Sequence, residues 1–493
     1  MRRFTPLLCL LGMISLPFAC SDESTPTDDD DGGSKKKKKS EPTFIGAPGV
    51  TVKQVAMYQS LKRPLMIDGA AGPADVPLVA GREAVIRVFY ETDETYDGSE
   101  LVARLEIEGA EAPLEVAATL AGASTEEDIN STVNFVVPGE LVGQTFSYAV
   151  GLLEEGKTDD ENAAARWPSD GGWDPVPVEG PQQKLRVILA PFQYNYDGSG
   201  RVPDMSPEAV EAYRVRLRQI YPVSDVEVSV RAVTPWSQYI GPDGTGWQQV
   251  GLRLYQFRQQ DGTADDVYYY GIFNPTGSFN QYCGGGCLLG VTLLNNDPPA
   301  TGSVDLRLAL GIGFPQYAAD TMAHELGHSH GRNHAPCGGP DGIDPQYPHP
   351  GATLGTWGLD STTMTLIPPD SATDIMGYCN KQWVSDYTFR ALLNRGKNVN
   401  LPKYHSNRSS AVVVGIDGAG TATWGGETQA SDALGGRAVA ATLVRSNGSR
   451  TPAAARYFAW DHMPGGIAIV PGATDGVTQV EVEVDGQRRI AVR

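Results

Sequence analysis

Four of the seven histidines of this 493-residue chain lie within eleven residues, in the stretch HELGHSHGRNH from His324 to His334. His324 and His328 are four positions apart, so on a helix they project from the same side, one turn apart. Gly331 follows, and glycine readily adopts the positive φ that lets a helix end abruptly. The segment 314–331 is therefore predicted to be a helix that ends at this glycine, after which the chain turns and brings His334 beside the other two.

The same spacing indicates a metal site. Three neutral imidazoles can hold one tetrahedral ion at about 2.0–2.1 Å and leave its fourth position for water, which separates a catalytic zinc from a structural one. Glu325 is placed to take a proton from that water rather than to bind the metal. HExxH alone arises by chance in helices, whereas HExxHxxGxxH is a far more specific pattern. We therefore expect His324, His328 and His334 to bind Zn²⁺, with Glu325 as the general base.

Downstream of this motif lies the hexapeptide DIMGYC, residues 374–379. The zinc motif followed by Met376 resembles the metzincin clan of zinc endopeptidases, in which a methionine turn forms a hydrophobic floor beneath three histidines. The resemblance covers about residues 184–400. It implies peptide hydrolysis by zinc-activated water, with Glu325 passing the proton to the leaving amine. Tyr378 has the same spacing from the methionine as in astacins and serralysins. This implies that its phenol helps the transition-state oxyanion, the alternative being that it only packs under the site.

Two features limit the resemblance. Ala335 follows the third histidine, where astacins and adamalysins have an acidic residue, so no subfamily is assigned. No cysteine lies between Cys20 and Cys283, so an upstream thiol cannot bind the zinc as it does in some metzincins. A looser similarity, mainly in the zinc motif, exists to the secreted mucin-cleaving zinc proteases of enteric bacteria.

The residues before the motif alternate between strand and helix patterns. The apolar run KLRVILAPFQY, residues 184–194, has the length of a buried strand, and the next helix begins with Ser206 as N-cap and Pro207 at its first position. The full order is strand, helix, strand, helix, strand, strand and then the zinc helix. This order predicts an α/β domain with a largely parallel sheet. We expect residues 184–400 to form the catalytic domain, closed by a helix with Ser385 as N-cap.

Period-two patterns flank this domain on both sides. From 44 to 156, short alternating runs separated by Gly, Asp and Pro predict an all-β sandwich, an accessory binding or spacer module. Residues 157–183 predict a linker, and residues 401–493 a small C-terminal β domain of sandwich type. The expected fold is multidomain: a central α/β, metzincin-like catalytic domain flanked by all-β sandwich-like domains.

The N-terminus has the form of an export signal. Residues 1–20 hold two arginines, a short apolar run and a small residue before Cys20, as in a signal peptide. Cys20 resembles the lipidated cysteine of bacterial lipoproteins, although Leu16 lies four residues before it rather than three, so plain secretion is the alternative. Residues 21–43 combine acidic and basic blocks and predict a disordered tether. We expect an exported protein, either secreted or held as a lipoprotein at the bacterial cell envelope or outer surface.

Four cysteines remain for the exported chain: Cys283, Cys287, Cys337 and Cys379. An even number in an exported protein predicts two disulfides, with three connectivities possible, and a zinc site is the alternative. Beside a metzincin-like site, a Cys337–Cys379 bond would tie the exit of the zinc helix to the methionine turn. Cys283–Cys287 would then be the second bridge.

Three further residues near the motif are expected outside the metal site. His330 is predicted to neighbour the ligands or to face solvent. His349 is predicted to lie in a surface loop, the alternative being that it lines the cleft. Asp374 either bonds to the methionine turn or is a plain turn residue.

Composition and motif together predict the function. A net charge of −20 argues against nucleic acid as a partner. We expect a monomer that acts on a protein or glycoprotein substrate and that contacts the membrane through a lipid anchor if Cys20 is lipidated. The leading hypothesis is an exported zinc-dependent endopeptidase. The alternatives are a catalytically silent surface binding or adhesion protein on a peptidase scaffold, and a zinc hydrolase of another bond.

Overall fold

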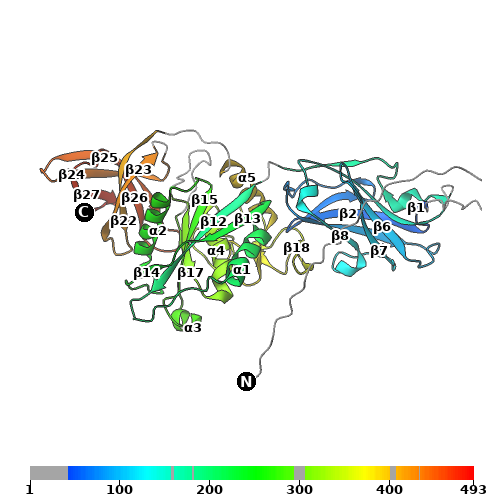
Figure 1. Cartoon of the computed structure of the whole chain (residues 1–493), viewed down its shortest axis with the longest axis horizontal. Coiled ribbons are helices and arrows are strands. Elements are labelled where there is room, and N and C mark those ends of the chain that lie inside the picture. The colour runs from blue at the N-terminus through cyan, green and yellow to red at the C-terminus, as the bar shows by residue number, and fades with distance from the viewer. Residues whose placement is uncertain (1–42, 157–159, 180–182, 294–305, 400–406, 432–433) are drawn as a thin grey trace, which may run out of the picture. The chain divides into compact units, whose positions relative to one another are not determined.

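The computed structural model describes residues 43–156, 160–179, 183–293, 306–399, 407–431 and 434–493 (Figure 1). The predicted signal peptide, the candidate lipidation site Cys20 and most of the predicted tether lie outside the described residues. The described chain is rich in strands, which form several separate sheets, as expected of a multidomain, β-rich protein. In this part of the chain no helix combines the length and the apolar character that crossing a membrane requires.

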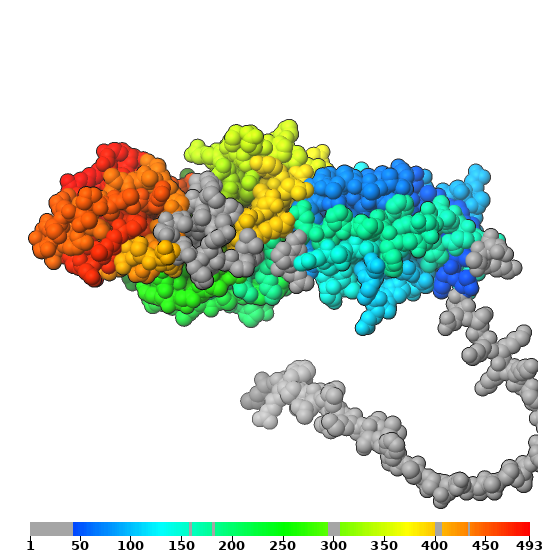
Figure 2. Space-filling model, turned by 90° about the horizontal axis from the view of Figure 1, so that it is seen from above, coloured from blue at the N-terminus to red at the C-terminus, as the bar shows by residue number. Residues whose placement is uncertain are grey.

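Two antiparallel sheets form the first module. Its strands are β1 (Phe44–Gly46), β2 (Val50–Tyr58), β3 (Lys62–Ile67), β4 (Ala70–Ala71), β5 (Ala84–Thr92), β6 (Leu101–Ile107), β7 (Leu114–Ala118), β8 (Val133–Val137) and β9 (Thr145–Glu155). One sheet has the order β1-β9-β6-β7 and the other β4-β3-β2-β5-β8. Alternate side chains, such as Leu101, Ala103 and Leu105 of β6, fill one core between the sheets, in agreement with the predicted sandwich. In Figure 2, segments far apart in the sequence, coloured blue and teal, lie side by side in this module.

Part of the segment predicted as a linker joins this module instead. β10 (Arg166–Trp167) and β11 (Asp174–Pro177) both pair with β9. Val176 is buried in the module's core and Trp167 packs against it. β11 contains two prolines, which suits an edge strand, and the same prolines are why the pattern predicted a loop.

A largely parallel sheet forms the centre, as the alternating pattern predicted. Its strands are β12 (Lys184–Tyr194), β13 (Asp225–Val230), β14 (Thr234–Trp236), β15 (Val267–Phe273), β16 (Gly290–Thr292) and β17 (Leu308–Ile312). The order is β13-β12-β15-β17-β16, with only β16 antiparallel to its neighbour, while β14 pairs with β12. The predicted order of elements lacked β17 and the short helix α3 (Phe279–Cys283). Both are only five residues long, too short for their periodicity to be recognised.

Four longer helices accompany this sheet: α1 (Pro207–Ile220), α2 (Trp247–Asp261), α4 (Pro315–Ser329) and α5 (Asp386–Val399). The hydroxyl of Ser206 accepts the N–H of Ala209 and caps α1, as predicted. A continuous core joins the buried faces of α1, α4 and α5 to the sheet. Two small two-stranded sheets lie between α4 and α5: β18 (Gly358–Asp360) with β19 (Thr365–Ile367), and β20 (Thr373–Asp374) with β21 (Gln382–Trp383).

The C-terminal segment forms one antiparallel sheet rather than the two of a sandwich. Its strands are β22 (Arg408–Ile416), β23 (Ala422–Ser431), β24 (Arg437–Arg445), β25 (Arg450–Ala459), β26 (Gly466–Pro471), β27 (Val477–Val484) and β28 (Gln487–Val492), in the order β23-β22-β26-β25-β24-β27-β28. Val412 and Val470 belong to the sheet's own core, whereas their neighbours Val413 and Ile469 share a core with α2 and the central sheet. Both faces of β22 and β26 are therefore buried, and one of them packs against α2 and the central sheet. This packing holds the loop that joins β25 to β26 (residues 460–465, the β25–β26 loop) beside the central sheet.

Candidate metal centre

Helix α4 and the turn after it carry the histidine motif. His324, Glu325 and His328 are buried on α4, which ends at Ser329. Gly331 has φ +80°, the left-handed conformation predicted for the helix end. The backbone of His334 is then bonded to Gly342 and Asp344, which fixes the third histidine beside the helix.

The ring nitrogens of these three histidines face one another. Nε2 of His328 lies 3.0 Å from Nε2 of His324 and 3.1 Å from Nε2 of His334. Each Nδ1 instead lies against a backbone carbonyl: that of Ile375 for His324 (2.7 Å), of Arg332 for His328 (2.6 Å) and of Asp341 for His334. A carbonyl can only accept, so each Nδ1 carries the proton and each Nε2 presents a lone pair. Three converging lone pairs repel one another unless a cation lies among them, and the residues therefore fit a metal ion.

A fourth histidine, which sequence reasoning missed, completes the group. Nε2 of His462, in the β25–β26 loop, lies 2.7 Å from Nε2 of His334. One ligand atom from each of His324, His328, His334 and His462 falls within 4.8 Å of the others. A buried group of four histidines could thus bind a metal ion. The sequence predicted three histidine ligands and an open fourth position, whereas the structure brings a fourth imidazole beside the other three.

The pKa values of the four histidines differ in direction. Burial lowers the pKa of His324 and of His328 well below the usual value, and neighbouring histidines lower it further. Burial and then His462 lower the pKa of His334 to about 4. All three are therefore neutral at pH 7, the form that binds metal. Burial acts in the same direction on His462, but the charges of Glu325 and Asp461 outweigh it and raise its pKa to about 10.

Two buried carboxylates lie against the fourth histidine. Oε1 of Glu325 is 3.2 Å from Nδ1 of His462, and Oε2 of Glu325 has no hydrogen-bond partner among the described residues. Asp461 accepts the N–H of Thr292 and of His462 through Oδ1. Its Oδ2 lies 3.7 Å from Nε2 of His328 and has no hydrogen-bond partner among the described residues. Burial, followed by the charge of Glu325, raises the pKa of Asp461 well above its usual value. A cation nearby favours the ionised form of such a pair of carboxyl groups.

Met376 lies beneath α4. A Cβ atom added to Gly327 would come within 2.4 Å of its sulfur, so glycine is required for this close approach. The main chain of Met376 is held by Oδ1 of Asp374, which accepts its N–H at 2.8 Å, while Oδ2 accepts the N–H of Ser385 at 2.9 Å. The hydrogen bond proposed for Asp374 is therefore present, and the hydroxyl of Ser385 caps α5 as predicted.

Tyr378 stands at the rim of the site. Its hydroxyl lies 3.3 Å from Nε2 of His334, and its side chain is partly exposed. Burial, followed by the charge of Glu325, raises the pKa of Tyr378, so the phenol keeps its proton. This position is beside the ring of the third histidine rather than under the site.

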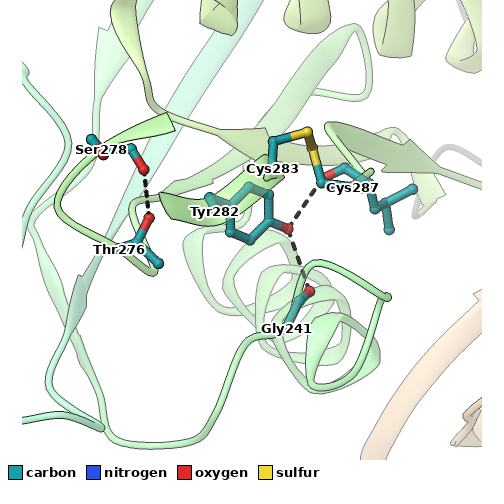
Figure 3. The surroundings of a disulfide bond; sticks show 7 residues. Gly241, Thr276, Ser278, Tyr282, Cys283 and Cys287 are labelled. Atoms are coloured by element: carbon teal, nitrogen blue, oxygen red, sulfur yellow. Dashed lines mark hydrogen bonds between the residues drawn. A yellow bond between two sulfur atoms is a disulfide. The ribbon is translucent and has the colours of Figure 1, made fainter. Parts of the chain in front are cut away.

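Both predicted disulfides are present. Cys337–Cys379 joins the turn after His334 to the segment that follows Met376. Cys283–Cys287 closes a short loop after α3, and Figure 3 shows Tyr282 beside it with its hydroxyl bonded to the carbonyl of Gly241 (3.3 Å). The same hydroxyl lies 3.1 Å from the carbonyl of Leu288. The alternative of a cysteine zinc site is thereby excluded, and two disulfides indicate an exported protein.

The other two histidines near the motif lie outside the metal group. His330 is buried, contrary to the alternative that it faces solvent: it stacks on Tyr268, and its Nδ1 donates to the carbonyl of Leu326 at 2.7 Å. Helical geometry placed His330 away from His324 and His328, and in the structure Tyr268 of β15 covers its ring there. His349 is half-buried and pairs with Asp386 at 2.6 Å.

A cleft of about 1210 Å³ gives access to the centre. Its walls include His324, Glu325 and His334 from the motif, Tyr378 from the methionine turn, and His462 with Met463 from the β25–β26 loop. The C-terminal sheet therefore contributes to the site, which its predicted role as a separate domain did not include.

The sequence carries only a weak signal for the missed residues. Asp461 and His462 lie in the stretch WDHMPGG, the tip of a hairpin between two apolar strands. Polar residues at hairpin tips are common.

No family model matches the sequence, and no curated protein is similar to it. The geometry of the centre is therefore the basis for assigning a function.

Proposed function

We propose that the protein is an exported zinc-dependent endopeptidase whose catalytic domain, residues 184–400, is metzincin-like. The observation that carries the proposal is the convergence of Nε2 of His324, His328 and His334 beside the buried carboxylate of Glu325. The resemblance implies three parts together. These are a helix that bears two ligands and a base, a sharp turn to the third ligand, and a methionine packed under the helix.

The donor set suits zinc. Imidazole nitrogens favour zinc, copper, iron and nickel over magnesium and calcium, which prefer oxygen. Zinc adopts tetrahedral geometry with such ligands, and their Nδ1 atoms are held by backbone carbonyls as is usual for metal-bound histidines. Bound there, zinc would lower the pKa of a coordinated water toward ~7 and polarise a carbonyl oxygen.

Glu325 and Tyr378 supply the acid–base and electrostatic roles. Oε2 of Glu325 has no partner among the described residues, so it is free to accept a proton from water and return it to the leaving amine. The protonated phenol of Tyr378, 3.3 Å from Nε2 of His334, is close enough to donate a hydrogen bond to negative charge that develops beside the metal ligands.

The cleft and the disulfides bear on substrate and location. A volume of about 1210 Å³ exceeds the roughly 300–1,000 Å³ of small-molecule sites, which supports a protein or glycoprotein substrate. Two disulfides support action outside the cytoplasm. The proposal includes anchoring of the chain to a membrane through a lipidated Cys20.

The test compares the zinc-loaded full-length protein with Glu325→Ala on casein and gelatin, with and without a chelator. Because His462 lies against the other ligands, both proteins are made with His462 and with His462→Ala. We expect chelator-sensitive cleavage and, in Glu325→Ala, full zinc content with turnover lower by roughly 10²–10⁴-fold. Undiminished cleavage in Glu325→Ala refutes its role as base, and the absence of cleavage in both backgrounds refutes the peptidase.

A second candidate function is favoured by one observation. Four protein ligands would fill all four positions of a tetrahedral ion, as in a structural site, whereas a catalytic site keeps one position open. If His462 never leaves the group, the metal only stabilises the protein, and the module acts as a scaffold for surface binding. The two candidates differ in the His462→Ala background: the fourth position is open in either case, and only the peptidase then cleaves substrate.

A further inference from the structure

We propose that the β25–β26 loop is a built-in plug of the metal centre, in which His462 is the fourth protein ligand and closes the position that hydrolysis needs open. The plug deepens the proposed function and rests on it, because only a catalytic centre needs an open position. It assigns the C-terminal sheet a role in controlling the site.

The direction of the His462 ring is the first observation. Its Nε2 lies 2.7 Å from Nε2 of His334, and all four ligand atoms fall within 4.8 Å. Nitrogens bound to one tetrahedral ion at about 2.0–2.1 Å lie about 3.3 Å apart, so small shifts of the rings suffice to admit the ion. A side chain that served only to bind substrate would present its nitrogen to the cleft, whereas His462 presents it to the other three histidines.

The second observation is what the other ring nitrogen does. Nδ1 of His462 lies 3.2 Å from Oε1 of Glu325 and 3.2 Å from the carbonyl oxygen of Gly290. Metal-bound histidines donate their second N–H to a carboxylate or carbonyl in this way, which fixes the ring and strengthens the ligand. The same contact engages Oε1 of Glu325, so the plug ties down one oxygen of the general base as well as filling the fourth position.

The third observation is how the loop is held. The N–H of Asp461 donates to the carbonyl of Thr292 at 3.1 Å, and the N–H of Thr292 donates to Oδ1 of Asp461 at 3.0 Å. Behind the tip, the indole of Trp460 is buried and donates to Gln248 on α2. Ahead of it, Met463 and Pro464 line the cleft.

With these contacts the tip of the loop can leave the histidine cluster while the base of the loop, at Trp460, stays in place. Two hydrogen bonds contribute about 1 kcal/mol each. Among the described residues, the tip is held further by the His462 ring and by Met463, which packs against the core from a partly buried position. Trp460 anchors the loop in the core shared with α2 and does not have to move with the tip. A polypeptide bound along the cleft meets Met463 and Pro464 first, and its binding offsets the loss of these few contacts.

The test counts imidazole ligands by X-ray absorption spectroscopy at the zinc edge on the zinc-loaded full-length protein. We expect four imidazoles in the wild type and three in His462→Ala. His349→Ala removes a histidine that pairs with Asp386 outside the cluster, so it is the matched control and should keep four. Three imidazoles in the wild type would overturn the proposal.

Turnover gives the second readout. Since only the open fraction hydrolyses substrate, a plug closed in about nine molecules of ten holds turnover about tenfold below that of His462→Ala at equal zinc content. A His462→Ala protein with full zinc, three imidazoles and slower cleavage than the wild type contradicts the plug, because His462 would then assist the reaction. A change from four imidazoles to three with no cleavage in either protein supports the fourth ligand and removes the proposed peptidase instead.

Discussion

The four histidines of the centre come from two segments of unlike construction. Three lie within eleven residues, on α4 and the turn that follows it, while His462 is 128 residues beyond His334 on a loop of another sheet. The helix period and one left-handed glycine place the first group. The second depends on the packing of β22 and β26 against α2. The first group is thus locally determined, and the second can move without disturbing it.

The largest difference between the two segments is expected in metal affinity. His328→Ala removes the ligand that lies between His324 and His334, 3.0 and 3.1 Å from them. It should cost roughly 3 kcal/mol or more of the 10–16 kcal/mol that a complete zinc site contributes. His462→Ala should cost less, because α4 and its turn keep three ligands in place. Competition titration with a chelating dye measures both, and an equal or larger loss in His462→Ala would break the comparison.

Sequence reasoning reached the locally determined part of the molecule. The bounds of β12, the cap of α1 at Ser206 and the end of α4 before Gly331 follow from residues within one turn or one strand. The cysteine pairs also agree with the structure, because the resemblance to metzincins implied a bond between Cys337 and Cys379. Periodicity and capping act over a few residues, so a single sequence is enough to read them.

The parts that were missed depend on contacts between distant segments. β17 is a five-residue strand whose side chains are all buried, a run without a period to recognise. Asp461 and His462 reach the centre only because both faces of the C-terminal sheet are covered. The apolar run AVVV at 411–414 shows no alternation for the same reason, and burial on two sides could have been inferred from it.

Trp460 is the residue on which the position of the loop segment depends. Its indole is buried, donates to Gln248, and packs so close to Gly251 of α2 that a Cβ there would lie 2.6 Å from the ring. Trp460→Ala should lower the free energy of unfolding by about 3–5 kcal/mol and, in the zinc-loaded protein, reduce the imidazole count from four to three.

Trp383 offers the matched control on the other side of the centre. It is equally buried, and its indole donates to the carbonyl of Ser60 at 3.0 Å. Trp383→Ala should cost a similar free energy in urea denaturation yet leave four imidazoles. If Trp460→Ala also keeps all four, the loop does not depend on this anchor, and the contrast between the two segments is weaker than we infer.

The smallest expected effect concerns pH and compares His330 on α4 with His462 on the loop. Burial lowers the pKa of His330 from 6.5 to about 3, so its neutral form stabilises the fold above pH 6.5 and this contribution is lost as the pH falls toward 3. His462 has the opposite sign: its raised pKa of about 10 gives a contribution that is present below pH 6.5 and lost as the pH rises through 10.

In the metal-free protein, His330→Gln should remove roughly 2 kcal/mol of the stability lost between pH 7 and pH 5. Gln keeps a donor for the carbonyl of Leu326, and His330→Phe keeps the stacking on Tyr268, so the pair of variants separates charge from packing. The test is the urea midpoint of each protein at pH 7 and at pH 5. If both variants lose as much stability between these pH values as the wild type does, His330 does not cause the loss of stability in acid.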